Sequence, residues 1–339
     1  MRQKIVAEIS ANHAGSLDRA LALVDAAAAA GADAVKLQTW VPGTMVLDPG
    51  LILRDGPWAG KNLHALYEEA HTPWEWHEPI FTRGKERGVE VFSSPFDYAS
   101  VDFLVKLGVK RIKIASFELV DQALIRYAAA TKLPLILSTG MAERGEIQDA
   151  IWAAKAGGAH ETDITLLKCT SAYPADPEHA NLRTMAHMKQ SWQGVEVGLS
   201  DHTPGIAVAL IAAAMGATMI EKHLTLDDGM DTLDRPFSIT PAELAFLCLE
   251  APRAALAPGE ATYGPKPGEK PQLELRRSLY FARDLAPGDT IQPGDLVTAR
   301  PAKGLPCRML GKTIGRSVNK PVKRGDPVIA EVLAEQVTA

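Results

Sequence analysis

Eight short apolar segments recur along the first 225 residues, and each of them ends in polar or charged residues. They are residues 4–10, 34–39, 89–94, 111–116, 134–139, 164–171, 195–202 and 219–225. Alanine- and leucine-rich stretches with helical periodicity lie between most of them, for example 17–30 and 204–215. Eight β-α units in series indicate a (β/α)8 barrel, whose reactive groups lie at the carboxyl ends of the strands. We therefore expect the polar ends to converge on one site.

The composition is typical of a globular enzyme without charge-driven partners. The 339 residues carry a net charge of −5, and the mean hydropathy is −0.04. This balance argues against binding to nucleic acid or to a membrane surface, and no apolar stretch is long enough to span a bilayer. Cys169, Cys248 and Cys307 are odd in number and widely spaced, which predicts reduced thiols and a cytoplasmic location.

The organisation of the chain changes after about residue 250. Proline and glycine are frequent in residues 251–275, which predicts a linker without helices or strands. Three β-like runs follow, at 278–282, 296–299 and 327–330, and they predict a small β-rich domain. We therefore expect a catalytic barrel over residues 1–250, a linker over 251–275 and a second domain over 276–339.

A long segment separates the second predicted strand from the third. It spans residues 41–75 and is bordered or occupied by five aromatic residues, Trp40, Trp58, Tyr67, Trp74 and Trp76. On the catalytic face of a barrel, an insertion of this size is usually a lid or a substrate wall. Packing of the aromatic side chains on a helix is an equally good interpretation.

Alternation along each strand predicts which side chains meet in the barrel lumen. Lys36 and Gln38 share one face of the second strand, and Lys113 lies inside another apolar strand. Two lysines in so poorly solvated a place favour an anion site, and serines at neighbouring strand ends would complete a cradle for phosphate, namely Ser94, Ser116, Ser138 and Ser200. Structural ion pairs for the two lysines are the alternative interpretation.

Two histidines end adjacent strands and predict a metal site. His202 and His223 follow polar residues at the ends of the seventh and eighth segments. Imidazoles at two adjacent strand ends can reach one divalent ion and leave open positions for substrate oxygens. Glu8, at the end of the first strand, is a candidate general acid or base, although a structural pair with a lysine is nearly as good an interpretation.

Several of these segments resemble, in order, the motifs of the sialic acid synthase family, namely residues 7–15, 31–39, 92–96, 113–118, 138–141, 168–174, 198–202 and 221–223. Residues 276–339 resemble that family's antifreeze-like SAF domain, so the resemblance covers essentially the whole chain. It implies a TIM barrel followed by a small β-rich SAF domain. It also implies an enzyme that condenses phosphoenolpyruvate with the open-chain aldehyde of an N-acetylated amino sugar, with release of phosphate by C–O cleavage.

The resemblance further implies a role for each candidate residue. Phosphoenolpyruvate would be held by Lys36, Ser94, Lys113, Ser116, Ser138, Ser171 and Ser200. The metal, Mn²⁺ or Mg²⁺ with Co²⁺ as a third candidate, would be held by His202 and His223, which with Glu8 would form the catalytic set. The sugar would contact Glu8, Gln38, Tyr173, Asp234 and, from the SAF domain of the other subunit in a domain-swapped homodimer, Arg300.

The choice of sugar also follows from the resemblance. Residues 11–15, 63–77 and 168–173 look most like the branch of the family that acts on 2,4-diacetamido-2,4,6-trideoxy-L-altrose. N-acetylmannosamine and the precursor of legionaminic acid are the alternative sugars. A third interpretation is an inert barrel with a carbohydrate-binding SAF module, but the lysines and histidines of the predicted site argue against it. Two departures are Ser171, where sialic acid synthases can carry Asn, and the residues around Asp234.

Overall fold

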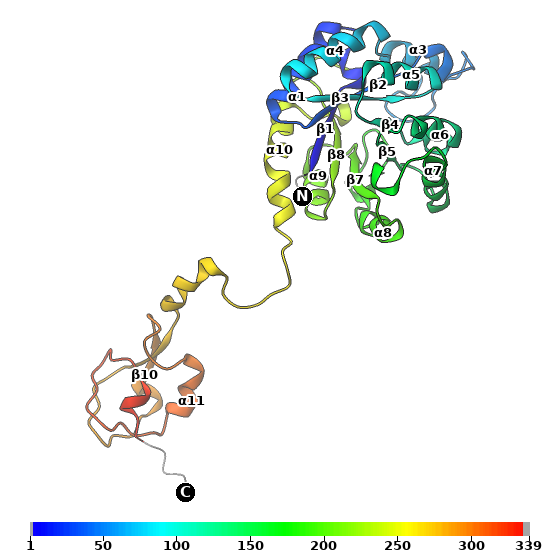
Figure 1. The fold of residues 1–339 in the computed structure, drawn as a ribbon. Helices are drawn as coiled ribbons and strands as arrows, with labels where there is room; N and C mark the ends of the chain where they lie inside the picture. The colour runs from blue at the N-terminus through cyan, green and yellow to red at the C-terminus, as the bar shows by residue number, and fades with distance from the viewer. Residues whose placement is uncertain (1–2, 335–339) are drawn as a thin grey trace. The chain divides into compact units, whose positions relative to one another are not determined.

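In the computed structural model, which describes residues 3–334, eight parallel strands close into a barrel (Figure 1). The strands are β1 Lys4–Glu8, β2 Ala34–Thr39, β3 Glu90–Pro95, β4 Ile112–Ile114, β5 Leu135–Ser138, β6 Ile164–Cys169, β7 Glu196–Asp201 and β8 Met219–His223. Each pairs with its neighbour in chain order, and β8 returns to β1 with His223 beside Glu8. The (β/α)8 barrel predicted from the sequence is confirmed.

Helices cover the outside of this barrel (Figure 1). They are α1 Leu17–Ala30, α4 Trp74–Arg87, α5 Tyr98–Leu107, α6 Gln122–Ala130, α7 Arg144–Ala156, α8 Arg183–Ser191, α9 Ala207–Ala214 and α10 Pro241–Leu256. Helix α1 illustrates how local sequence determines where a helix begins and ends. The side chain of Ser16 accepts a hydrogen bond from the Arg19 N–H and begins the helix, and Gly31, at a φ of 86°, ends it. Within residues 3–334, no helix is long and apolar enough to cross a bilayer.

Two apolar layers define what the strands bury. Side chains on the outer face of the strands pack against the helices in the main core. On the inner face, the lower lumen is filled by a separate apolar cluster of Val6, Ala34, Phe92, Ile136, Leu167 and Met219. Polar inner-face residues follow this plug toward the carboxyl ends of the strands, as the alternation predicted.

Two short helices form part of the long segment after β2, α2 Pro42–Met45 and α3 Leu63–Ala70. Most of its aromatic side chains have structural contacts. Trp40 is buried and packs edge-on against Tyr67, and Trp74 stacks on Phe103 with ring centroids 4.4 Å apart. The packing interpretation therefore holds for these residues, whereas Trp58 lies elsewhere and is described with the site.

The chain divides into two compact units, residues 1–259 and 260–339. The second unit contains β9 Ser278–Phe281 and β10 Leu296–Ala299, an antiparallel pair, and the short helix α11 Leu310–Thr313, around its own apolar core. The expected strand at 327–330 is wrong: Pro327 makes only an isolated bridge to Tyr280, because proline offers no N–H to a ladder. The domain limits drawn from the sequence stay predictions.

The expected absence of helices from 251–275 is also wrong. Helix α10 continues through Pro252 to Leu256, and a 3₁₀ segment spans Pro267–Leu275. Pro252 lies in the last two turns of α10, where its missing N–H removes a single hydrogen bond. Prolines of residues 251–275 therefore occur in helical turns as well as in extended chain.

Two buried histidines connect the segment after β2 to the barrel. The Nε2 of His13 lies 3.3 Å from the Thr72 hydroxyl. In α4, His77 lies 2.7 Å from the Thr39 hydroxyl through Nε2 and 3.1 Å from the Pro73 carbonyl through Nδ1. Burial lowers the pKa of each imidazole to about 4.

We expect acid to destabilise the barrel through these two imidazoles. In the unfolded chain each takes up a proton near pH 6.5, whereas in the folded state each stays neutral until about pH 4. The unfolded state binds more protons in this window, so the free energy of unfolding falls by about 3 kcal/mol per imidazole as the pH drops from about 6.5 to 4. Urea unfolding across this range measures the effect. His77→Gln should flatten the slope, and the exposed-site control His160→Gln should keep it.

Candidate active site

Four charged side chains lie buried in the lumen above the apolar plug: Glu8, Lys36, Lys113 and Glu221. The Lys36 ammonium forms a short ion pair with Glu8 and lies 3.6 Å from Oε1 of Glu221. The Lys113 ammonium lies 3.9 Å from Oε2 of Glu221. The ion pairs that were the alternative interpretation for the two lysines are therefore present, and any anion must bind beside them.

The two lysines are not compensated equally. Burial disfavours the charge of both, but Glu221 and Glu8 together raise the pKa of Lys36 above its usual value. For Lys113, burial dominates and lowers the pKa, because Glu221 is more distant and the charge of Lys36 opposes it. Lys113 is thus the cation that gains most from a bound anion.

The predicted serines lie along the strand ends as separate contacts. The Ser94 hydroxyl is 3.4 Å from the Lys36 ammonium, and Ser200 donates to Oε1 of Glu221 at 3.3 Å. The Ser138 hydroxyl is buried without a hydrogen-bond partner among residues 3–334. A buried hydroxyl in that state favours a polar ligand nearby.

Ser116 and Ser171 approach each other over Gly140. The Gly140 N–H donates to Oγ of Ser116 at 3.1 Å. A Cβ at this glycine would lie 2.0 Å from Oγ of Ser171 and 2.8 Å from Oγ of Ser116, so a larger residue would displace both hydroxyls. The thiol of Cys169 lies 3.8 Å from Ser171, and although burial opposes ionisation, His202 and other polar neighbours lower its pKa to about 7.

The two predicted metal ligands lie together at the carboxyl ends of β7 and β8. The imidazole centroids of His202 and His223 are 5.3 Å apart. The Nδ1 of His202 donates to the Thr170 carbonyl at 2.9 Å, which leaves a lone pair on Nε2. The Nδ1 of His223 lies 3.3 Å from Oδ2 of Asp234 but makes no hydrogen bond among the described residues.

These imidazoles fit a shared divalent ion. Two imidazoles bound to one metal through bonds of about 2.1 Å hold their centroids about 5 Å apart, close to the separation seen here. The carboxylate of Asp234 beside Nδ1 of His223 and the fixed tautomer of His202 suit a ligand pair, because a metal-binding imidazole usually has a polar partner at its other nitrogen. Among residues 3–334, no group of three or more His, Cys, Asp or Glu is arranged to hold a metal.

Aromatic side chains cover the imidazole pair. Tyr173 packs on His202 and Phe237 on His223, with ring centroids 4.4 and 4.9 Å apart. Trp58, from the segment after β2, lies 5.8 Å from the ring of Tyr173, and its indole N–H donates to the Leu233 carbonyl at 3.3 Å. Trp58 therefore belongs to the wall of the site, as the lid interpretation of that segment requires.

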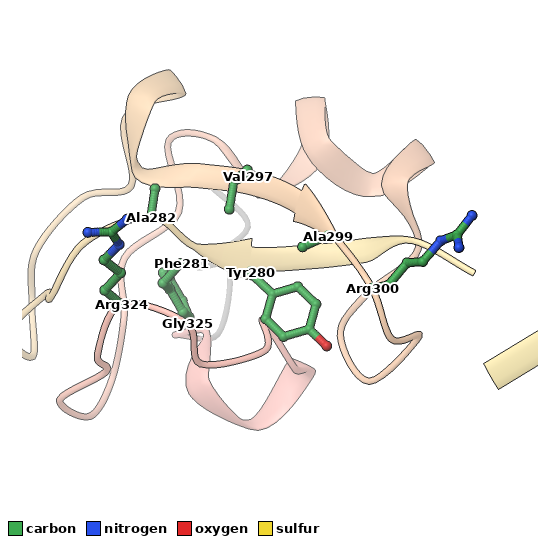
Figure 2. A pocket seen from close by; sticks show the side chains of 8 residues that line it. All are labelled: Tyr280, Phe281, Ala282, Val297, Ala299, Arg300, Arg324 and Gly325. Carbon is green, nitrogen blue, oxygen red and sulfur yellow. The ribbon is translucent and has the colours of Figure 1, made fainter. Parts of the chain in front are cut away.

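The remaining predicted sugar contacts differ in their placement. Asp234 accepts a hydrogen bond from the Ser10 hydroxyl at 2.7 Å and lies beside His223, so it is at the site. Gln38 is half-buried on β2, paired in register with Ser94. Arg300 lies in the second unit, where it borders a hollow of about 370 Å³. Figure 2 shows that Arg300 and Arg324 point away from each other at opposite ends of this hollow, so they do not converge on one anion.

Two acidic residues of the site were not assigned a role from the sequence. Glu221 contacts both lysines, and both imidazoles also act on its charge, so it lies between the anion cradle and the metal ligands. The sequence signal that could have identified Glu221 is its position in the same short motif as His223. Glu118 has a buried oxygen without a hydrogen-bond partner among residues 3–334, and burial raises its pKa to about 7. It suits proton exchange near neutral pH.

The sequence pattern of the NeuB family matches residues 23–263, and that of the SAF domain matches residues 276–333. The chain belongs to the NeuB family. The resemblance stated from the motifs is thereby confirmed, together with a barrel followed by a SAF domain.

Relatives of this NeuB family member match nearly its full length. The pseudaminic acid synthase of Helicobacter pylori is 39% identical over 334 residues, which cover 97% of each chain. The N,N'-diacetyllegionaminic acid synthase of Campylobacter jejuni is 34% identical and covers 96% of this chain and 98% of its own. The crystal structure of the N-acetylneuraminic acid synthetase from Leptospira borgpetersenii, in complex with citrate, has a TM-score of 0.71 at 32% identity and covers 81% of this chain and 91% of its own.

The unequal compensation of the lysines predicts how this NeuB family member binds phosphate. Lys113→Met should weaken binding of inorganic phosphate by about 30-fold, since a charge-assisted contact contributes about 2 kcal/mol. Isothermal titration with phosphate measures the change, and far-UV circular dichroism checks the fold. The exposed-site control Lys110→Met should bind phosphate like the wild type. Wild-type affinity in a folded Lys113→Met protein would show that this lysine has only a structural role.

Proposed function

We propose that this protein is a pseudaminic acid synthase that condenses phosphoenolpyruvate with 2,4-diacetamido-2,4,6-trideoxy-L-altrose. The observation that carries the proposal is the position of Glu221, which connects the buried lysines to the imidazole pair. An anion cradle and a metal-ligand pair separated by one carboxylate suit the joining of a phosphorylated acid to an aldehyde. Full-length relatives with this name support the choice of sugar.

The reaction forms one bond between carbons and breaks one bond to phosphate. C3 of phosphoenolpyruvate attacks the aldehyde carbon, and the aldehyde oxygen takes up a proton to become a hydroxyl. Water adds at C2, the C2–O bond to phosphate breaks, and the oxygen from water remains as the ketone after loss of two protons. The products are inorganic phosphate and a nine-carbon 2-keto acid, so the enzyme is a transferase.

The lumen residues would bind and orient phosphoenolpyruvate. Lys36 and Lys113 supply the positive charge for its carboxylate and phosphate, and hydroxyls at the strand ends donate hydrogen bonds, those of Ser94, Ser116, Ser138, Ser171 and Ser200. Because Glu8 and Glu221 already offset the two ammonium charges, a bound trianion would share the lysines with these carboxylates and would depend on the hydroxyl donors as well. The apolar plug borders this contact on the inner face of the barrel.

His202 and His223 would hold a divalent ion, Mn²⁺ or Mg²⁺, with Co²⁺ as a third candidate. When bound, the ion would polarise the sugar aldehyde as a Lewis acid. The chain itself prepares the ligands, because the hydrogen bond from His202 to the Thr170 carbonyl fixes the tautomer that presents Nε2.

Glu221 would take up a proton at the reacting centre. Burial favours its neutral form, but Lys113, Lys36 and the two imidazoles act more strongly and lower its pKa, so it is ionised and able to accept a proton. Glu8, the predicted acid or base, accepts the Ser10 N–H at 2.7 Å and pairs with Lys36. These contacts suit a residue that orients Lys36 and meets a sugar hydroxyl. Glu118, whose charge interacts with Lys113, is a further candidate for proton transfer.

A panel of sugars tests the proposed function directly. Phosphate release from phosphoenolpyruvate should be fastest with the diacetamido-trideoxy sugar and should require Mn²⁺ or Mg²⁺ after chelation. The aromatic wall of Trp58 and Tyr173 discriminates against an added hydroxyl by roughly a hundredfold, and unpaired acetamido-binding groups penalise N-acetylmannosamine further. His223→Ala should lose at least about a thousandfold in rate.

Three results would contradict parts of this proposal. Equal efficiency with N-acetylmannosamine or the legionaminic acid precursor would replace the sugar and keep the chemistry. Full activity in excess chelator would remove the metal. No phosphate release with any sugar would favour a non-catalytic carbohydrate-binding protein.

The proposal includes a domain-swapped homodimer in a cytoplasmic enzyme. Residues 1–259 carry 23 Lys and Arg against 32 Asp and Glu, whereas residues 260–339 carry 13 against 9. The two units thus have opposite net charges, which suits attraction between two copies of this chain. Arg300 is exposed and could donate to an acetamido carbonyl of the sugar in the other subunit. Cys169 and Cys307 are free thiols, which suits a reducing compartment.

Subunit complementation tests the role of Arg300. Arg300→Ala and His202→Ala should each be nearly inactive. In a mixed dimer, the barrel with an intact His202 would receive an intact Arg300, so activity should return to about half of wild type per heterodimer. The measurement is phosphate release after subunit exchange, which differently tagged subunits verify. Exchange without recovery would show that Arg300 serves its own barrel or no site.

A further inference from the structure

A buried ion pair lies on the outer face of the barrel, directly behind the imidazole pair. Asp201 and Lys222 face each other in register on β7 and β8, and the Lys222 ammonium lies 2.9 Å from Oδ2 of Asp201. Both are buried, with 3% and 0% exposure. On the same face of these strands the other residues are apolar and belong to the main core, namely Val197, Leu199, Ile220 and Leu224. A buried ion pair within this otherwise apolar layer of the core requires an explanation.

The ion pair also holds the residue that follows His202, which is Thr203. The Lys222 ammonium also donates to the Thr203 carbonyl through a short contact. Oδ1 of Asp201 accepts hydrogen bonds from the Thr203 N–H at 2.9 Å and from its hydroxyl at 2.8 Å. Thr203 is therefore fixed at its N–H, its carbonyl and its side chain. His202 lies between this anchored residue and the end of β7.

The same pair also fixes the strand that carries the second imidazole. Lys222 lies between Glu221 and His223, whose side chains point into the lumen. One ion pair thus joins the ends of β7 and β8 at the level of both predicted ligands. Because its contacts end on the backbone next to His202, a change in the pair would alter the spacing of the two imidazoles.

Stability alone does not account for such a pair. Burial of two charges costs about as much as their attraction returns, and apolar side chains of similar volume are often as good or better. We propose that Asp201 and Lys222 are positioning residues that set the separation of His202 and His223 for a divalent ion. This inference rests on the proposed function only in that these imidazoles hold the ion.

An apolar replacement of the pair separates positioning from stability. In Asp201→Leu/Lys222→Met, the core stays filled and no buried charge is left alone. The urea midpoint should fall only by the cost of the Thr203 polar groups that lose their partners, and the protein should stay folded. Phosphate affinity should be unchanged. Mn²⁺ affinity, measured without substrates by electron paramagnetic resonance of the free ion, should fall by about 10- to 100-fold, as for other groups that orient metal ligands.

The matched control replaces a partly buried ion pair at the amino ends of neighbouring strands. Arg111 donates to Glu90 at 2.7 and 2.9 Å, far along the strands from the site. Glu90→Leu/Arg111→Met should keep wild-type Mn²⁺ affinity. Should the first double variant fail to fold, Asp201→Asn gives the same test, because it keeps the shape and an acceptor for Thr203 but weakens the contact with Lys222.

The outcomes are distinct. A folded Asp201→Leu/Lys222→Met or Asp201→Asn protein with wild-type Mn²⁺ affinity would overturn the positioning role and leave the proposed function intact. Failure of the wild-type protein to bind Mn²⁺ in the same titration, and Mg²⁺ or Co²⁺ by isothermal titration calorimetry, would overturn the metal site and the inference together. Loss of Mn²⁺ affinity with wild-type phosphate affinity supports the positioning role.

Discussion

The charge balance of the barrel lumen is the constraint on which the site depends. Ammonium groups cannot stay charged above an apolar plug unless carboxylates or bound anions accompany them. Here Glu8 and Glu221 supply part of the compensation, and Lys113 receives the smaller share. The site is therefore stable without a ligand and still gains when an anion binds. The apolar plug fills the inner face below these groups.

The period of two along the strands explains why much of this site could be predicted from the sequence. Alternation places Lys36 in the lumen and Leu37 against the helices, and it separates the inner Glu221 from the outer Lys222. The closed barrel then brings the strand ends together. Periodicity of apolar residues and the polar end of each strand were sufficient for this step.

Other features depend on contacts that no local pattern encodes. Trp58 and Trp74 are tryptophans of the same segment after β2, and nothing in the local sequence distinguishes them. In the structure Trp58 lies against Tyr173 at the site, whereas Trp74 stacks on Phe103. Which carboxylate pairs with which lysine depends on distances across the lumen. The helix through Pro252 is a case in which tertiary packing outweighs local composition.

Strand β8 shows how the inner and outer faces cooperate. Three consecutive residues take up different tasks: Glu221 meets the lysines of the lumen, Lys222 pairs with Asp201 among the helices, and His223 faces the other imidazole. Side chains of a strand cannot change face independently, since a shift by one residue would exchange all of them. The outer pair therefore fixes the register of the inner groups. A barrel can place the predicted metal ligand and the proposed proton acceptor on one strand because that register is held on the outer face, where neither substrate nor solvent competes for the contact.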